Sequence, residues 1–162
     1  MVLQTEQTIF KLKEEIFEFF SNAENLEFHT PSFLKFIILT KFLIEMREVI
    51  EIAYRLKLYW VPLKWESLIT SWQPYESFID EQVKNLYTKW VHTHIFESVE
   101  SVCLIKDLVN YKVFGDSLTS NVFVSKNLRK LFEYRTQRLM EYFNEPCNDN
   151  PATKQLVQIT RI

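Results

Sequence analysis

The chain has 162 residues, of which 47% are hydrophobic and 25% are charged, and its formal net charge is −2. This length and apolar content are typical of one folded domain with a substantial core, and they argue against a disordered chain. Because 19 basic residues nearly balance 21 acidic ones, general binding of nucleic acid or of an anionic membrane is not expected.

Gly115 is the single glycine of the sequence, whereas average usage would give roughly eleven. Phosphate-binding loops and the nucleophile elbow each need at least two glycines, so these motifs are excluded. Tight hairpin turns also favour glycine, which argues against a strand-rich fold. The composition therefore predicts an all-α protein.

The first predicted helix covers residues 5–20, where apolar residues such as Ile9 and Ile16 recur at helical spacing. The loop 21–29 follows. A long central helix is predicted over 31–60, because Thr30 is a good N-cap and Pro31 suits the first turn. This helix is apolar on nearly all sides up to about residue 44, and it then becomes amphipathic.

The rest of the chain shows further helical spacing. The predicted elements are a short helix over 65–72, one or two helices over 75–112 and a helix over 125–143, with a brief extended piece at 122–124. We expect one all-α domain over 1–143, followed over 144–162 by a linker and a possible C-terminal docking helix. The predicted architecture is an irregular bundle, or a helical-repeat-like array, of five to seven helices around 31–60.

Membrane and secretory segments are not expected. Lys35 and Lys41 interrupt the most apolar part of the chain, which leaves no run of the ~18 apolar residues that a membrane span needs. The N-terminus lacks a basic stretch followed by an apolar one, so no secretory signal is expected. Two cysteines are too few for a disulfide framework, and we expect a reduced intracellular setting, cytoplasmic or nuclear.

The pair His92 and His94 is the cluster that most resembles metal ligands. On a strand, alternate residues share a face and two imidazoles can bind one zinc ion, whereas on a helix they point about 200° apart. Because the local pattern favours a helix, we expect hydrogen-bonded or exposed histidines and no metal cofactor. A third ligand would have to come from His29, Cys103 or a distant glutamate.

Other catalytic arrangements are not evident. The four aspartates are scattered singly, which does not favour a cluster of carboxylates. Cys103 lies on an apolar stripe and is expected to be an inert core thiol, and nothing near Cys147 in the sequence would lower its pKa. We therefore expect a protein that is not an enzyme.

Aromatic residues crowd the segment 60–75, which contains two prolines. Because tryptophan, tyrosine and arginine are enriched at protein interfaces, this corner and one arginine of the last predicted helix form the candidate partner-binding surface. These residues are Trp60, Trp65, Trp72, Tyr75 and Arg135. For Arg135 the alternative is an arginine whose stem packs while its head reaches water.

No known family is recognised in the sequence. The function predicted from it is a non-catalytic helical scaffold or protein-interaction domain, a subunit or segment of a larger assembly. The alternative is a metal-binding helical enzyme or sensor that uses His92 and His94, with Cys103 as a further candidate ligand.

Overall fold

The computed structural model describes residues 1–40, 46–58, 61–84, 87–113, 118–143 and 156–160. In this part of the chain, eight strands form one antiparallel sheet with the order β2-β3-β4-β5-β6-β7-β1-β8. The strands are β1 (Val2–Ile9), β2 (Ile37–Ile38), β3 (Glu51–Leu58), β4 (Val61–Gln73), β5 (Ser77–Lys84), β6 (Tyr87–Val99), β7 (Val102–Val113) and β8 (Leu156–Thr160). The helices are α1 (Lys13–Ser21), α2 (Asn25–Phe28), the 3-10 turn η1 (Ser32–Leu34) and α3 (Leu118–Tyr142).

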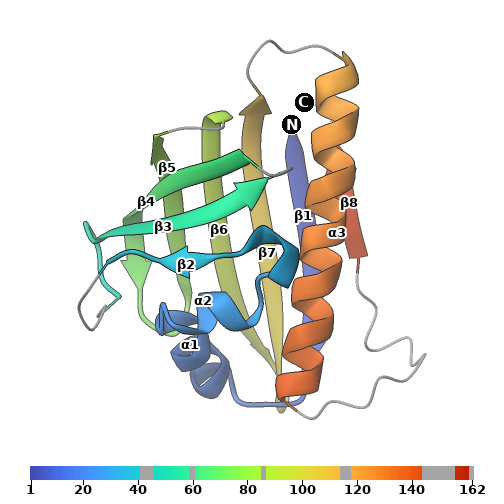
Figure 1. The fold of residues 1–162 in the computed structure, drawn as a ribbon. Helices are drawn as coiled ribbons and strands as arrows, with labels where there is room; N and C mark the ends of the chain where they lie inside the picture. Colours follow the sequence, from blue (N-terminus) through green and yellow to red (C-terminus); the bar gives the residue numbers. More distant parts are fainter. Residues whose placement is uncertain (41–45, 59–60, 85–86, 114–117, 144–155, 161–162) are drawn as a thin grey trace.

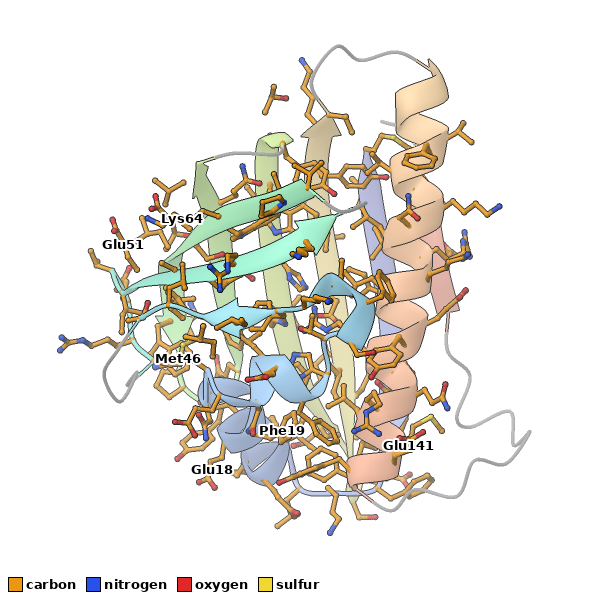
Figure 2. All side chains as sticks on the ribbon, in the orientation of Figure 1. Glu18, Phe19, Met46, Glu51, Lys64 and Glu141 are labelled. Carbon is orange, nitrogen blue, oxygen red and sulfur yellow. The ribbon has the colours of Figure 1, made fainter. Side chains whose placement is uncertain are left out.

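The sheet is strongly curved, so that β2, β3 and β4 run across the direction of β5, β6, β7 and β1 (Figure 1). The long helix α3 lies along β1 and β8, and α1 and α2 close one end of the fold. Phe19 of α1 reaches the end of α3, where its ring contacts Tyr142 and Phe143, while Glu18 and Glu141 lie at the surface (Figure 2). The concave side of the sheet thus faces an interior that the helices cover.

The all-α prediction is wrong, and the segment 31–60 shows why. Instead of a long helix it contains η1, β2 and β3, and residues 41–45 and 59–60 lie outside the described residues. In β3, apolar side chains such as Ile52 and Leu56 alternate with charged ones such as Arg55. This period of two is the pattern of a strand, and helix spacing fits the same letters only because aliphatic residues are so frequent.

The segments 65–72 and 75–112, predicted as helices, are instead β4, β5, β6 and β7. In β6 the buried residues fall strictly at every second position: Trp90, His92, His94 and Phe96. Polar residues occupy the middle of this inward face, so the apolar alternation that marks a strand is interrupted in the sequence. The interruption concealed the strands.

The two ends of the chain also differ from the prediction. The segment 5–20 is divided between β1 and α1, and the docking helix expected near the C-terminus is β8, which pairs with β1. The prediction of a helix over 125–143 is confirmed, because α3 contains nearly all of it. That helix begins earlier than expected and includes 122–124, which had been predicted as extended.

The scarcity of glycine did not prevent hairpins. Among the described residues, four other than glycine have a positive φ: Lys35, Val49, Tyr75 and Glu100, with φ of 43°, 65°, 63° and 56°. Tyr75 lies between β4 and β5, and Glu100 is the first residue of the two-residue connection between β6 and β7. This conformation costs a non-glycine residue roughly 1–2 kcal/mol. Turns can therefore form without glycine at a modest cost in stability, which is why the scarcity of glycine did not indicate an all-α fold. Gly115 lies outside the described residues.

Two apolar clusters fill the interior, one at each end of the sheet. The cluster at the α1 end contains Ile9, Ile16, Phe17, Phe19, Phe20, Ile69, Phe78, Phe96, Cys103, Ile105, Leu139 and Phe143. The cluster at the opposite end contains Leu3, Trp65, Trp90, Val109, Tyr111, Leu128 and Phe132. Between the two, the same strands carry polar inward side chains, which we term the polar belt: Thr5, Tyr54, Ser67, Asp80, His92, His94 and Asp107.

A membrane-crossing helix is not found among the described residues, since none of their helices is both long enough and apolar enough.

Candidate functional site

A cavity of about 720 Å³ lies between the concave face of the sheet, α3 and the segment from α1 to β3. Its volume falls within the range typical of small-molecule sites. The wall is mostly apolar and includes Phe20, Leu26, Phe33, Ile52, Leu56, Trp65, Trp90, Leu128 and Leu131. One group of polar side chains in the wall comes together from different elements: His29, Tyr54, Ser67, Asp80, His92, His94 and Arg135. Other polar residues of the lining are Thr30, Lys35, Lys57, Asn127 and Lys130.

The centre of the polar belt is formed by two histidines of β6 and one aspartate from each neighbouring strand. Asp80 of β5 lies directly opposite His92, and Asp107 of β7 lies directly opposite His94. Side chains of opposite residues in antiparallel strands are about 5 Å apart, and diagonal neighbours are within reach of long side chains. Strand pairing therefore brings together four groups that are well separated in the sequence.

One oxygen of each aspartate faces both imidazole rings. Asp107 Oδ1 lies 2.9 Å from His92 Nε2 and 2.9 Å from His94 Nδ1. Asp80 Oδ2 lies 3.3 Å from His92 Nδ1 and 3.3 Å from His94 Nε2. The two rings are 3.8 Å apart between centroids, and Phe78 stacks on His94 at 4.2 Å.

The other oxygen of each aspartate is held by a hydroxyl group. Thr5 Oγ1 donates to Asp107 Oδ2 at 3.2 Å, and Ser67 Oγ donates to Asp80 Oδ1 at 3.4 Å. Ser67 Oγ in turn accepts a hydrogen bond from Trp65 Nε1 at 3.0 Å. Since the single hydroxyl proton of Ser67 goes to Asp80, the phenol of Tyr54, 3.2 Å away, must be the donor in its contact with Ser67.

Both carboxylates are ionised at neutral pH. Burial alone would raise the pKa of Asp80, but hydrogen bonds from His92 and His94 outweigh burial and lower that pKa well below its ordinary value. The pKa of Asp107 is lowered for the same reasons. Burial disfavours the charged form of His92, yet its hydrogen bonds with Asp107 and Asp80 raise its pKa above the ordinary value. The centre of the belt therefore attracts cations, whether protons or metal ions.

A second polar group, the pair His29 and Arg135, lies in the same cavity wall. Arg135 Nη2 is 3.3 Å from His29 Nε2. Because arginine can only donate, Nε2 accepts this hydrogen bond, and the proton of the neutral ring is on Nδ1. Burial and then the positive charge of Arg135 hold the pKa of His29 well below its ordinary value. His29 Nδ1 is buried and has no hydrogen-bond partner among the described residues.

The structure separates the residues that the sequence had grouped as a partner-binding surface. Trp65 is only 7% exposed and lines the cavity, and Arg135 also lines it. Trp72 packs against Phe17, while Tyr75 is 41% exposed at the turn between β4 and β5. Trp60 lies outside the described residues. Contact of these side chains with a protein partner stays a prediction.

The structure does bring His92 and His94 together with a carboxylate. Their ligand atoms and those of Asp80 all lie within 4.8 Å of one another. Cys103 is buried in the cluster at the α1 end and belongs to no part of the polar belt, and Cys147 lies outside the described residues. Asp80 and Asp107 were missed because each is isolated in the sequence. The signal that would have found them is a single aspartate at an inward position of each strand that flanks the two histidines.

Known proteins share the fold of this chain at low sequence identity. A START superfamily protein from Mycobacterium smegmatis matches with a TM-score of 0.67 and 10% identity, covering 89% of this chain and 97% of that protein. Protein CV1439 from Chromobacterium violaceum matches with a TM-score of 0.67 and 11% identity, covering 90% of this chain and 97% of that one. The ginseng major latex-like protein 151 from Panax ginseng matches with a TM-score of 0.60 and 10% identity, covering 88% and 97%.

No protein-family model matches the sequence. No curated protein matches it significantly either. The structural likenesses therefore show the fold, which is START/Bet v1-like, and they assign no ligand or activity to this chain.

Proposed function

We propose that the protein binds a small apolar molecule that carries a carboxylate group. The cavity supplies the apolar surface, and the observation that carries the proposal is the position of Arg135 in its wall beside the neutral His29. The fold supports the proposal by analogy only, since this chain shares it with a protein named as a START superfamily member.

A carboxylate is the group that best complements this part of the wall. The guanidinium group of Arg135 is half-buried, lies 5.2 Å from the centre of the Phe132 ring and takes part in none of the ion pairs found among the described residues, so a carboxylate in the cavity would give it a charged partner. Arginine binds a carboxylate through two parallel hydrogen bonds, which gives both affinity and orientation. The free N–H at His29 Nδ1 adds a donor in the same region.

The apolar part of the molecule would lie against the aromatic and aliphatic walls. Trp65 and Trp90 form one edge-to-face pair there, with ring centroids 5.3 Å apart. Because burial contributes about 25 cal/mol per Å² of apolar surface, the chain of such a molecule would supply most of the affinity and the carboxylate would fix its orientation.

A titration with a fluorescent polyunsaturated fatty acid, compared with its methyl ester, tests the proposal. The acid is expected to bind and the ester to bind at least tenfold more weakly, because a charge-assisted hydrogen bond contributes about 1.5–3 kcal/mol. The substitution Arg135→Met should weaken binding of the acid to the level of the ester. Arg129→Met, on the exposed side of the same helix, is the matched control and should bind like the wild type. Equal binding of acid and ester, or no binding of either, would overturn the proposal.

The volume of the cavity offers an independent test. Leu56→Trp places a larger ring into the wall, and it should weaken binding of the acid at least tenfold. Val83→Trp makes the same kind of change at an exposed site on β5, outside the cavity wall, and should leave binding unchanged. Equal affinities in both variants would contradict binding inside the cavity.

The protein-scaffold function expected from the sequence stays a separate prediction, as does the expectation that the protein is not an enzyme. Affinity capture with the double variant Trp65→Ala, Trp72→Ala tests the scaffold. Loss of a specific protein partner from a variant that remains folded would support it, and retention of every partner would contradict the proposed surface.

A further inference from the structure

We infer that Asp80, His92 and His94 form a binding site for one divalent transition-metal ion, such as Zn²⁺, in the wall of the cavity. The inference stands on the geometry of the polar belt and does not depend on which molecule the cavity binds. Two imidazoles and one carboxylate are a donor set that zinc and ferrous iron both accept.

The distances around Asp80 match the spacing of ligands around one metal ion, although the contact with His94 Nε2 also forms a long hydrogen bond. A hydrogen bond from a charged N–H to a carboxylate is normally about 2.7–2.9 Å long. The contacts of Asp107 Oδ1 with the two histidines have this length, at 2.9 Å each, and the one with His92 Nε2 is a hydrogen bond. Those of Asp80 Oδ2 are longer, at 3.3 Å each. Ligands about 2.0 Å from a tetrahedral zinc ion are about 3.3 Å from one another.

The arrangement of ring nitrogens supports the same conclusion. Each imidazole directs one nitrogen toward Asp107 and the other toward Asp80. When the nitrogens on the Asp107 side carry the protons, both remaining nitrogens present lone pairs toward Asp80 Oδ2. Three acceptor atoms then face one another, all within 4.8 Å, and their lone pairs repel one another unless a cation lies between them.

The surrounding residues have the roles that outer ligands of metal sites usually have. Metal-binding histidines commonly direct their second nitrogen to a carboxylate, which fixes the ring orientation. Asp107 is placed to do this for His92, through the 2.9 Å hydrogen bond from Nε2. The hydrogen bond from Ser67 to Asp80 Oδ1 leaves Oδ2 for the metal ion.

The three ligands leave at least one coordination position for a further donor. All three residues line the cavity, so this position faces the space where a small molecule would bind. A three-ligand site with an open position is typical of functional rather than structural zinc sites. The metal ion would therefore be accessible to an oxygen or nitrogen donor that enters the cavity.

The first experiment uses the tag-free full chain after treatment with a chelator. Titration with Co²⁺ should give visible absorption that saturates at one equivalent and is abolished by excess Zn²⁺. X-ray absorption spectroscopy of the Zn²⁺-loaded wild type should show two imidazole ligands and no sulfur ligand. Absence of stoichiometric binding, a sulfur ligand, or fewer than two imidazoles would overturn the inference. This measurement needs no variant, so it does not depend on whether a variant folds.

The second experiment assigns the ligands. Asp80→Asn and His94→Gln should each lower the affinity for Co²⁺ at least 100-fold, and Asp107→Asn should lower it about 10- to 100-fold. Glu81→Gln is the matched control, because Glu81 adjoins Asp80 on β5 and contacts Thr70 instead of the belt. It should bind as the wild type does. Unchanged affinity in folded Asp80→Asn and His94→Gln variants would show that the belt holds protons only. The metal-binding result does not depend on the proposed function, because metal affinity is measured in the absence of fatty acid.

Discussion

Asp107 lies directly opposite His94 in the pairing of β6 with β7, but its 2.9 Å hydrogen bond is with His92, one inward position further along the strand. The same oxygen is also 2.9 Å from His94 Nδ1, in a contact that makes no hydrogen bond. One carboxylate oxygen thus fixes the two rings side by side. Asp107 is therefore central to the stability of the polar belt.

The substitution Asp107→Asn should destabilise the fold by about 3 kcal/mol, because removal of one partner from a buried charged network leaves the other partners unpaired. Glu97→Gln breaks the ion pair of Glu97 with Lys106, whose side chains are 44% and 28% exposed. That change should cost less than about 1 kcal/mol. Urea unfolding of both variants, in the presence of a chelator, measures the difference. Equal losses would show that the belt carries no special share of the stability.

The thiol of Cys103 should be unreactive in the folded protein. Burial raises its pKa to about 11, so the thiolate that reacts with disulfide reagents is scarce at neutral pH, and the side chain is fully covered. In a Cys147→Ser background, an aromatic disulfide reagent should modify Cys103 only at the rate at which the protein unfolds. Guanidinium chloride should abolish this protection. Rapid modification under native conditions would contradict the buried position of Cys103 on β7.

The helix α3 could be predicted from the sequence because its apolar and charged residues separate onto opposite faces. Leu128, Phe132 and Leu139 are buried there, whereas Arg129 and Glu133 are exposed. Two polar residues, Arg135 and the buried Thr136, lie between Phe132 and Leu139, but they do not hide the helical spacing of the apolar residues. The period of this spacing is therefore close to that of an ideal amphipathic helix.

The strands could not be predicted in the same way, because the candidate site lies on their inward faces. In β1 the inward residues Thr5 and Gln7 separate Leu3 from Ile9, and Asp107 interrupts the inward face of β7 in the same manner. A search for alternating apolar residues finds only short fragments in such strands. The residues that make the site are thus the residues that concealed the fold.

The histidine pair could be identified from the sequence, but its environment could not. The two rings share a face only on a strand, so the wrong secondary structure led directly to the wrong view of His92 and His94. Asp80 and Asp107 join them through strand register, which is a long-range property. Local spacing in a single sequence does not contain that information.

The substitution Glu100→Gly should stabilise the protein by up to about 1 kcal/mol. Glu100 has φ of 56°, a region that glycine enters without a steric penalty, and this gain exceeds the entropy that glycine adds to the unfolded chain. Ser98→Gly, two residues earlier in β6, should have the opposite sign, with a loss of about 0.5–1 kcal/mol. Thermal unfolding measures both. A loss of stability with Glu100→Gly would contradict the left-handed turn conformation.

The pH dependence of stability should reveal His29. Because burial and the charge of Arg135 lower its pKa in the folded state, the unfolded chain takes up a proton that the folded protein does not. The free energy of unfolding must therefore fall as the pH drops below about 6.5, the pKa of an unperturbed histidine. Above that pH, the protonation of His29 makes no contribution to the pH dependence. His92, whose pKa is raised, acts with the opposite sign, since its stabilising contribution is present at low pH and is lost as the pH rises.

Comparison of the wild type with His29→Gln isolates the contribution of His29 to the pH dependence of stability. His92 is present in both proteins, so its contribution cancels in the difference. The glutamine oxygen can still accept a hydrogen bond from Arg135, but the side chain does not titrate. The stability of the variant relative to the wild type should rise as the pH falls from about 7.5 to about 5. Urea unfolding at a series of pH values, with a chelator present, measures this difference. A difference that stays constant with pH, or one that falls toward acid, would show that His29 is not held neutral in the cavity wall.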